Sequence, residues 1–157
     1  MIRNEIEKYI NQKYDALQEY PWADAPNFTT FKHKDNMKWF ALIMDVPYER
    51  LKIEKDGIVD IINLKNIPEM IGGLRKEKGI LPAYHMNKEY WISVLLDGTV
   101  DKEEVFNLID ISYELTMKKK WTNGDGENFK KLEIIKSLLY NQKKSQGGII
   151  CQSMIIQ

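Results

Sequence analysis

The sequence predicts a two-layer α+β domain, in which helices pack against a single sheet. Three observations support this class: the first twenty residues have helical periodicity, five short runs are apolar and rich in β-branched and aromatic residues, and a capped amphipathic stretch follows the last run. The predicted order is α-β-β-β-α-β-β-α. Its elements are a helix over 2–20, strands over 28–34, 37–46 and 57–65, a helix over 68–78, strands over 81–87 and 90–96, and a helix over 102–118.

The first helix is predicted by a stripe of apolar residues at intervals of three or four positions. Pro21 places the end of this helix at or before Tyr20, because proline disfavours helical geometry in the residue that precedes it. The stripe consists of Ile2, Ile6, Tyr9, Ile10, Tyr14 and Leu17.

The two strands on either side of Asp35-Asn36 predict a β-hairpin, because both of these residues favour turns. The predicted tip is basic. One interpretation is a solvated hairpin end whose charges discourage edge-to-edge aggregation. The other is a wing whose cations contact phosphates. The residues concerned are Lys32, His33, Lys34 and Lys38.

Local signals place the two later helices. Pro68 fits the first position of the helix over 68–78, because the N–H group that proline lacks is not needed there. Gly79 fits the position just beyond the end of that helix. Asp101 fits the N-cap of the last helix, with Glu104 three residues later as in a capping box.

Charge is unevenly distributed, although the formal net charge is zero. Residues 1–117 contain 15 basic against 20 acidic residues, a balance of −5, and residues 118–157 contain 8 lysines against 3 acidic residues, a balance of +5. Phosphate binding needs positive charge at the binding surface. If the protein binds DNA, we therefore expect the basic tail to act together with the hairpin lysines.

The sequence carries no sign of export or membrane insertion. No apolar run approaches the roughly 20 residues that span a bilayer, and the first residues lack the apolar core of a signal peptide. Cys151 is the single cysteine, which suits a reducing compartment. We therefore expect a cytoplasmic protein without membrane contacts.

Sequence motifs for catalysis or cofactor binding are also missing. His33 and His85 are 52 residues apart and have no partner at metal-ligand spacing. The chain has no glycine-rich phosphate loop before a helix and no nucleophile elbow. Its carboxylates form no identifiable acid–base pair. We therefore expect no catalytic residues, no metal site and no cofactor.

One short segment concentrates groups that bind ligands. A titratable imidazole, an amide, a cation and two aromatic rings occur within eight residues, and such a cluster could stack bases and hold phosphates or enclose a small molecule. The alternative is that the rings belong to the core and the polar residues form a turn. The cluster consists of Tyr84, His85, Asn87, Lys88 and Trp91.

The same segment resembles the MmcQ/YjbR family of small bacterial proteins. The resemblance covers roughly residues 1–117. It rests on Gly79-Ile80-x-Pro82-x-Tyr84-His85-Met86-Asn87-Lys88-x-x-Trp91, then Leu96-Asp97-Gly98 and Ser112-Tyr113, and upstream on Phe31-Lys32-His33, Lys38-Trp39-Phe40-Ala41 and Asn63-Leu64-Lys65.

The resemblance implies an antiparallel sheet backed by helices, in the element order given above. Such folds have been likened to frataxin-type and secretion-chaperone-type domains. The family is labelled as DNA-binding through a "double-wing" arrangement of hairpins. It brings no established catalytic residues.

We therefore predict a YjbR-like domain over 1–119 and a C-terminal extension over 120–157, formed by a helix and an apolar arm. The leading hypothesis is a non-enzymatic protein that contacts DNA phosphates. One alternative is a chaperone-like adaptor that binds a protein partner or a second copy. The other is a small-molecule binder. The candidate DNA contacts are Lys32, His33, Lys34, Lys38 and Lys88, and the candidate ligand or stacking residues are Tyr84, His85, Asn87 and Trp91.

Overall fold

The computed structural model describes residues 2–119, 133, 135, 136 and 140. The chain divides into two compact units, Met1–Lys118 and Lys119–Gln157. Of the second unit, only Lys119 and four helical residues are described, so the expected apolar arm lies outside the described residues.

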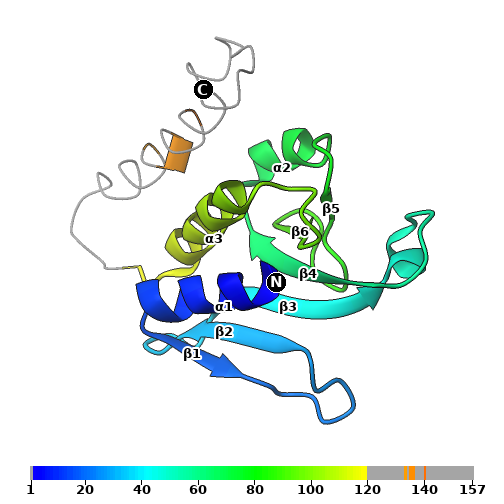
Figure 1. The fold of residues 1–157 in the computed structure, drawn as a ribbon. Coiled ribbons are helices and arrows are strands. Elements are labelled where there is room, and N and C mark those ends of the chain that lie inside the picture. Colours follow the sequence, from blue (N-terminus) through cyan, green and yellow to red (C-terminus); the bar gives the residue numbers. More distant parts are fainter. Residues whose placement is uncertain (1, 120–132, 134, 137–139, 141–157) are drawn as a thin grey trace. The chain divides into compact units, whose positions relative to one another are not determined.

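The first unit is a six-stranded antiparallel sheet with helices on one face (Figure 1). The strand order is β1-β2-β3-β4-β6-β5, and every neighbouring pair is antiparallel. The elements are α1 (Ile2–Lys13), β1 (Ala16–Glu19), β2 (Thr29–His33), β3 (Trp39–Pro47), the 3-10 helix η1 (Tyr48–Leu51), β4 (Ile58–Lys65), α2 (Pro68–Leu74), β5 (Ile80–Pro82), β6 (Trp91–Leu95) and α3 (Lys102–Thr116).

The predicted α+β class and antiparallel sheet are confirmed, but the sheet has one strand more than expected. The first helix ends at Lys13 rather than near Tyr20, and β1 follows it. β1 pairs with β2 through a register in which Leu17 lies opposite Lys32. The backbone groups of residues 16–19 gain ladder hydrogen bonds to β2, and this tertiary pairing outweighs a local helical pattern.

The main core lies between the sheet and the helices α1 and α3, which cover the same face (Figure 1). α1 contributes Ile6 and Ile10, both fully buried. None of the described helices is long and apolar enough to cross a membrane. The inward-facing residues of α3 include Val105, Leu108, Ile109 and Ser112, and the buried residues of the central strands that meet the helices include Ile43, Ile62, Leu64, Ile92 and Val94.

The opposite face of the sheet has a second, smaller core covered by loops rather than helices. Leu42, Met44 and Ile61 are buried there. The covering side chains come from three connecting segments and from the start of β3. They include Trp22, Phe28, Trp39, Leu51, Ile53, Tyr84 and Met86.

The second helix and the strand after it are shorter than predicted. Pro68 occupies the first turn of α2 as expected, but the helix ends at Leu74 and consecutive turns lead to Gly79. Gly79 is therefore not the residue that ends the helix. It has φ +90°, and a Cβ atom there would lie 2.6 Å from Val100 Cγ2. Asp101 caps α3 as predicted, its carboxylate accepting a bond from the Glu103 N–H group.

Asp110 of α3 joins the two large helices. Its carboxylate accepts hydrogen bonds from the hydroxyl groups of Tyr9 and Tyr14 and from the Lys13 ammonium, 2.7 Å away. The ring of Tyr14 also stacks on Tyr113 of α3, with ring centroids 3.9 Å apart. Burial and the hydrogen bond to Asp110 raise the pKa of Tyr14. Burial lowers the pKa of Lys13, but the hydrogen bonds to Asp110 and Tyr9 outweigh this and raise it overall.

We predict that Gly79→Ala lowers the free energy of unfolding by about 2–3 kcal/mol, because alanine would be strained at this φ and would clash with Val100. Urea denaturation measures the change. Gly72→Ala is the matched control, because no atom lies within 4 Å of a Cβ at that helical position. The control should leave stability unchanged or raise it by up to about 1 kcal/mol. Equal midpoints for the two variants would contradict the prediction.

We predict that Asp110→Asn lowers stability by about 1–2 kcal/mol at neutral pH, because three donors lose a charged acceptor. The raised pKa values of Lys13 and Tyr14 give a stabilising term that is complete below about pH 10, the pKa region of the unfolded chain, and is lost as pH rises through the folded values. The wild type should therefore lose more stability above about pH 10 than Asp110→Asn does. Glu103→Gln, at the other end of α3, controls for removal of a charge, and parallel pH profiles for wild type and Asp110→Asn would refute the assignment.

Candidate functional site

The turn between β2 and β3 is held rigidly against the end of α3. The Asn36 amide donates to the Thr116 carbonyl over 2.9 Å, and its oxygen accepts a bond from the Lys38 N–H group. Lys34 and Lys38 are exposed on this turn. The predicted hairpin therefore exists, and α3 fixes the position from which its two exposed lysines project.

His33 does not lie on the exposed tip. Its side chain is only 5% exposed, its Nε2 atom is hydrogen-bonded to Thr116 Oγ1 at 2.8 Å, and its ring lies 4.4 Å from the ring of Tyr113. The expectation that this residue is part of the basic surface is therefore wrong. The imidazole instead joins the end of β2 to the last turn of α3.

The remaining hairpin lysines differ in how freely they could meet a phosphate. Lys32 is mostly buried and forms an ion pair with Glu19. Lys34 pairs with Asp15, but the two side chains are 53% and 89% exposed, so solvent screens this attraction and the pair separates at little cost. Lys38 is exposed and makes no ion pair with another described residue.

The segment that contains the aromatic cluster is bound to the sheet by a polar row. Asn63 of β4 lies opposite Ser93 of β6, and Ser93 Oγ donates to Asn63 Oδ1. The Asn63 amide donates to the Tyr84 carbonyl, and the Tyr84 N–H group donates to Ser93 Oγ, each over 2.8 Å. These bonds satisfy the buried polar groups and hold residue 84 against the loop-covered face, as the core interpretation of Tyr84 expected.

After Tyr84 the chain leaves the sheet and turns back into β6. His85 is exposed with φ +56°, and this left-handed geometry ends the extended segment that was predicted to continue to Asn87. Asn87 stabilises the turn, because its side-chain oxygen accepts a bond from the Glu89 N–H group. Lys88 is exposed on this turn, and its carbonyl accepts a hydrogen bond from Arg75.

The strand register brings the two candidate groups to one end of the sheet. Trp39 begins β3, Lys65 ends β4 and Trp91 begins β6, with Lys65 directly opposite Trp91. β3 and β6 are two strand spacings apart, which is about 10 Å. We call this end, with the 34–38 turn, Lys65 and the 84–91 segment, the hairpin end. The lysines that project from it come from parts of the chain about 50 residues apart.

Comparison with known proteins identifies the family of this chain. The family model described as YjbR matches residues 11–115. The chain belongs to the YjbR family. The predicted resemblance is therefore confirmed, and the YjbR match spans both groups of candidate residues.

Relatives from other bacteria match this chain over about three quarters of its length. YyaQ of Bacillus subtilis, an uncharacterised protein, is 43% identical over 116 residues, which are 74% of this chain and 98% of YyaQ. A crystal structure of a Pseudomonas syringae protein is 48% identical, with a TM-score of 0.72, and the match covers 74% of this chain and all of the other. A crystal structure of a Deinococcus radiodurans protein is 28% identical, with a TM-score of 0.58 and coverage of 77% and 82%.

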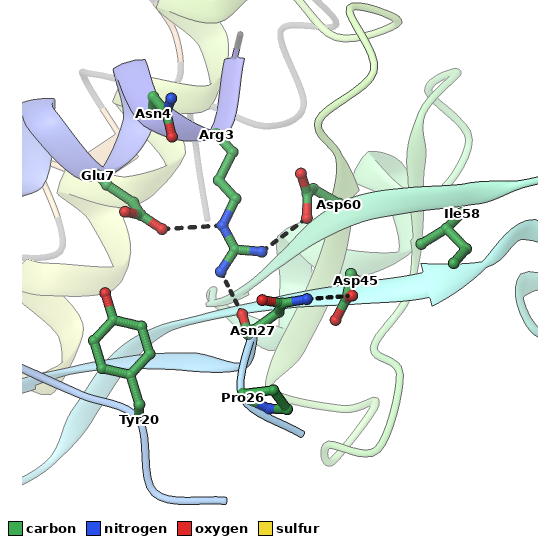
Figure 2. A pocket seen from close by; sticks show the side chains of 9 residues that line it. All are labelled: Arg3, Asn4, Glu7, Tyr20, Pro26, Asn27, Asp45, Ile58 and Asp60. Atoms are coloured by element: carbon green, nitrogen blue, oxygen red, sulfur yellow. Dashed lines mark hydrogen bonds and ion pairs between the residues drawn. The ribbon is translucent and has the colours of Figure 1, made fainter. Parts of the chain in front are cut away.

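A polar pocket lies at the other end of the β3–β4 pair, which we call the pocket end (Figure 2). Sequence reasoning missed it, because its lining comes from α1, the segment before β2, β3 and β4. No local pattern joins these four segments. The lining residues are Arg3, Asn4, Glu7, Tyr20, Pro26, Asn27, Asp45, Ile58 and Asp60.

The part of the chain that the structure describes holds no cluster of three or more His, Cys, Asp or Glu residues suited to a metal ion. The two histidines differ in setting, since His33 is buried and His85 is exposed on a turn. The hairpin end offers a set of lysine ammonium groups, one of which lies beside an exposed aromatic ring. Lys65 Nζ lies 6.0 Å from the centre of the Tyr90 ring, which is 41% exposed.

We predict that Asn63→Ala lowers stability by about 2–3 kcal/mol, because it leaves the Tyr84 carbonyl and the Ser93 hydroxyl without their buried partner. Hydrogen exchange at the Tyr84 amide should also become faster. Thr30→Val is the matched control: Thr30 lies in the same cross-strand row, opposite Leu42, and its buried hydroxyl has no partner among the described residues. This control should be neutral or stabilising. If Thr30→Val destabilises the protein as much as Asn63→Ala does, the loss does not depend on the hydrogen bonds of Asn63, and the prediction is contradicted.

Proposed function

We propose that this YjbR-family protein is a non-enzymatic, cytoplasmic DNA-binding protein that contacts phosphates with lysines at the hairpin end. The observation that carries the proposal is the arrangement of Lys38 and Lys88 at one end of the sheet, both exposed and neither in an ion pair with another described residue. Phosphate contacts of this kind position a protein on DNA without reading its sequence.

Rigidity supports this use of the hairpin. The Asn36–Thr116 hydrogen bond and the buried His33 ring fix the turn to α3 before any ligand arrives. Lysines on a fixed turn lose less conformational entropy on binding than lysines on a mobile loop. Lys34 adds a third cation, because its exposed pair with Asp15 is readily exchanged for a phosphate.

The charge balance at this end predicts weak binding. Carboxylates accompany the lysines there, and residues 1–117 as a whole carry a charge balance of −5. We therefore expect an affinity that depends strongly on salt and a small number of phosphate contacts. The lysines are Lys34, Lys38, Lys65 and Lys88, and the carboxylates are Asp35, Glu89 and Asp15, which pairs with Lys34.

We predict that the full-length protein binds a labelled duplex in fluorescence anisotropy, with log affinity falling as log salt rises. The triple variant Lys34→Ala/Lys38→Ala/Lys88→Ala should lower the magnitude of the salt slope by up to about 2.7, since each lost phosphate contact removes about 0.9. Lys8→Ala, an exposed lysine in the middle of α1, is the matched control and should leave the slope unchanged.

Two results would overturn the proposal. One is the absence of binding by the wild type at low salt, where electrostatic attraction is strongest. The other is an unchanged slope for the triple variant, which would assign the binding to other residues. Equal urea midpoints for wild type and variants ensure that a lost slope does not reflect unfolding.

A second candidate function, contact with a protein partner, is favoured by exposed apolar side chains at the same end. Met37 is 52% exposed at the tip of the turn, and Met117 is exposed just beyond α3. Methionine side chains adapt readily to a partner surface. If the protein binds a protein partner through this surface, we expect Met37→Ser to lower the affinity for that partner and to leave the salt slope of DNA binding unchanged.

A further inference from the structure

The pocket end exists because the sheet extends beyond its helical cover. Asp45 and Asp60 lie two residues along their strands from Ile43 and Ile62, and so they face the same, helix-covered side of the sheet. The start of α1 does not extend over this part of the sheet, so no helix covers β3 and β4 here, and the two strands form the floor of the pocket (Figure 1). The first turns of α1 and the segment 20–27 form its walls, and the cavity measures about 480 Å³, within the range of small-ligand pockets.

The floor carries two like charges in direct opposition. Asp45 and Asp60 are cross-strand partners, an arrangement that normally destabilises a sheet. Glu7 adds a third carboxylate from the α1 wall. Each of the three accepts one hydrogen bond from the described residues, over 2.9 or 3.0 Å, and has a second oxygen that accepts none from them.

Arg3 supplies the only cation among the residues that line the pocket, and four of its five N–H donors are occupied (Figure 2). Its Nε donates to Glu7, one terminal nitrogen donates to Asp60, and the other donates to the Asn27 carbonyl and to Thr29 Oγ1. These bonds tie α1 to β4 and to the segment before β2. With three carboxylates against this one guanidinium, the lining has a net charge of −2, which favours a cation over an anion.

The rim of the pocket is apolar and exposed. Tyr20 is 58% exposed and Ile58 is 67% exposed, and both line the pocket together with Pro26. Large apolar side chains that meet solvent beside a cavity are typical of binding sites. A tyrosine ring also attracts cations through its π face. The occupant should therefore combine a positive group with an apolar stem.

We propose that this pocket binds an organic cation, an ammonium or guanidinium group on an alkyl stem, with the charge at the carboxylates of Asp45 and Asp60 and the stem against the apolar rim. Such a group can come from a free small amine or from a basic side chain of a partner protein. The site lies at the opposite end of the sheet from the lysines of the proposed DNA contacts, so neither proposal depends on the other.

The test is a titration of the ¹⁵N-labelled full-length protein with n-butylguanidine, followed by amide chemical shifts. Shifts should concentrate at Asn27, Asp45, Ile58 and Asp60, with a dissociation constant of about 1 mM, as for a fragment-sized ligand. Butyrate and butanol share the stem without the positive charge and should give no shifts there. Butyrate binding as strong as that of butylguanidine would overturn the proposal.

Two variants distinguish a specific binding site from general attraction of the cation to an acidic surface. Asp45→Asn should weaken butylguanidine binding at least about threefold while keeping the fold, because the asparagine still meets Asn27 and Arg3 keeps both of its carboxylates. Asp35→Asn, at the hairpin end, should leave binding unchanged. Equal weakening by both variants, or no localised shifts in the wild type, would refute the site.

A second titration identifies the source of the cation, a free amine or a partner's side chain. A capped tripeptide with a central arginine is titrated in the same way as butylguanidine. Binding at least about tenfold tighter than that of butylguanidine assigns the pocket to a partner's side chain, and equal or weaker binding assigns it to a free amine. Both outcomes support the proposal, whereas failure of both ligands overturns it.

Discussion

The register between β3 and β4 is the constraint on which the rest of the structure depends. Seven residue pairs, from Ala41 opposite Leu64 to Pro47 opposite Ile58, define it. Because side chains alternate between faces, a slip of one residue would turn Ile43 or Ile62 away from the helices and expose the main core. The same register places Asp45 and Asp60 on the uncovered floor of the pocket and Asn63 beneath the segment that follows β5.

Most of the sheet and both large helices could be predicted from local pattern, because apolar spacing and turn residues are encoded within short windows. β1 could not. Leu17 continues the helical stripe of α1, and only the open edge of β2, more than ten residues later, makes an extended conformation favourable. The bend at His85 was missed for a similar reason, because the residue before it, Tyr84, is held by hydrogen bonds to Asn63 and Ser93, which lie outside the segment.

For the candidate residues too, local features could be predicted and features that depend on distant residues could not. Exposure of Lys38 and Lys88 followed from their turns, since turn residues usually meet solvent. The burial of His33 did not follow, because its partner Thr116 is 83 residues away. The pocket was beyond sequence reasoning altogether, since Arg3, Asn27, Asp45 and Asp60 have no shared local motif and meet only when the sheet has formed.

The two edges of the sheet are short: β1 has four residues and β5 has three, with Pro82 at the end of β5. A three- or four-residue edge offers few unpaired backbone groups to a neighbouring molecule, and proline offers no N–H group at all. Concentrated solutions of this domain should therefore resist growth into continuous intermolecular sheets. Any self-association would have to use side-chain surfaces, which dissociate on dilution more readily than a shared strand ladder does.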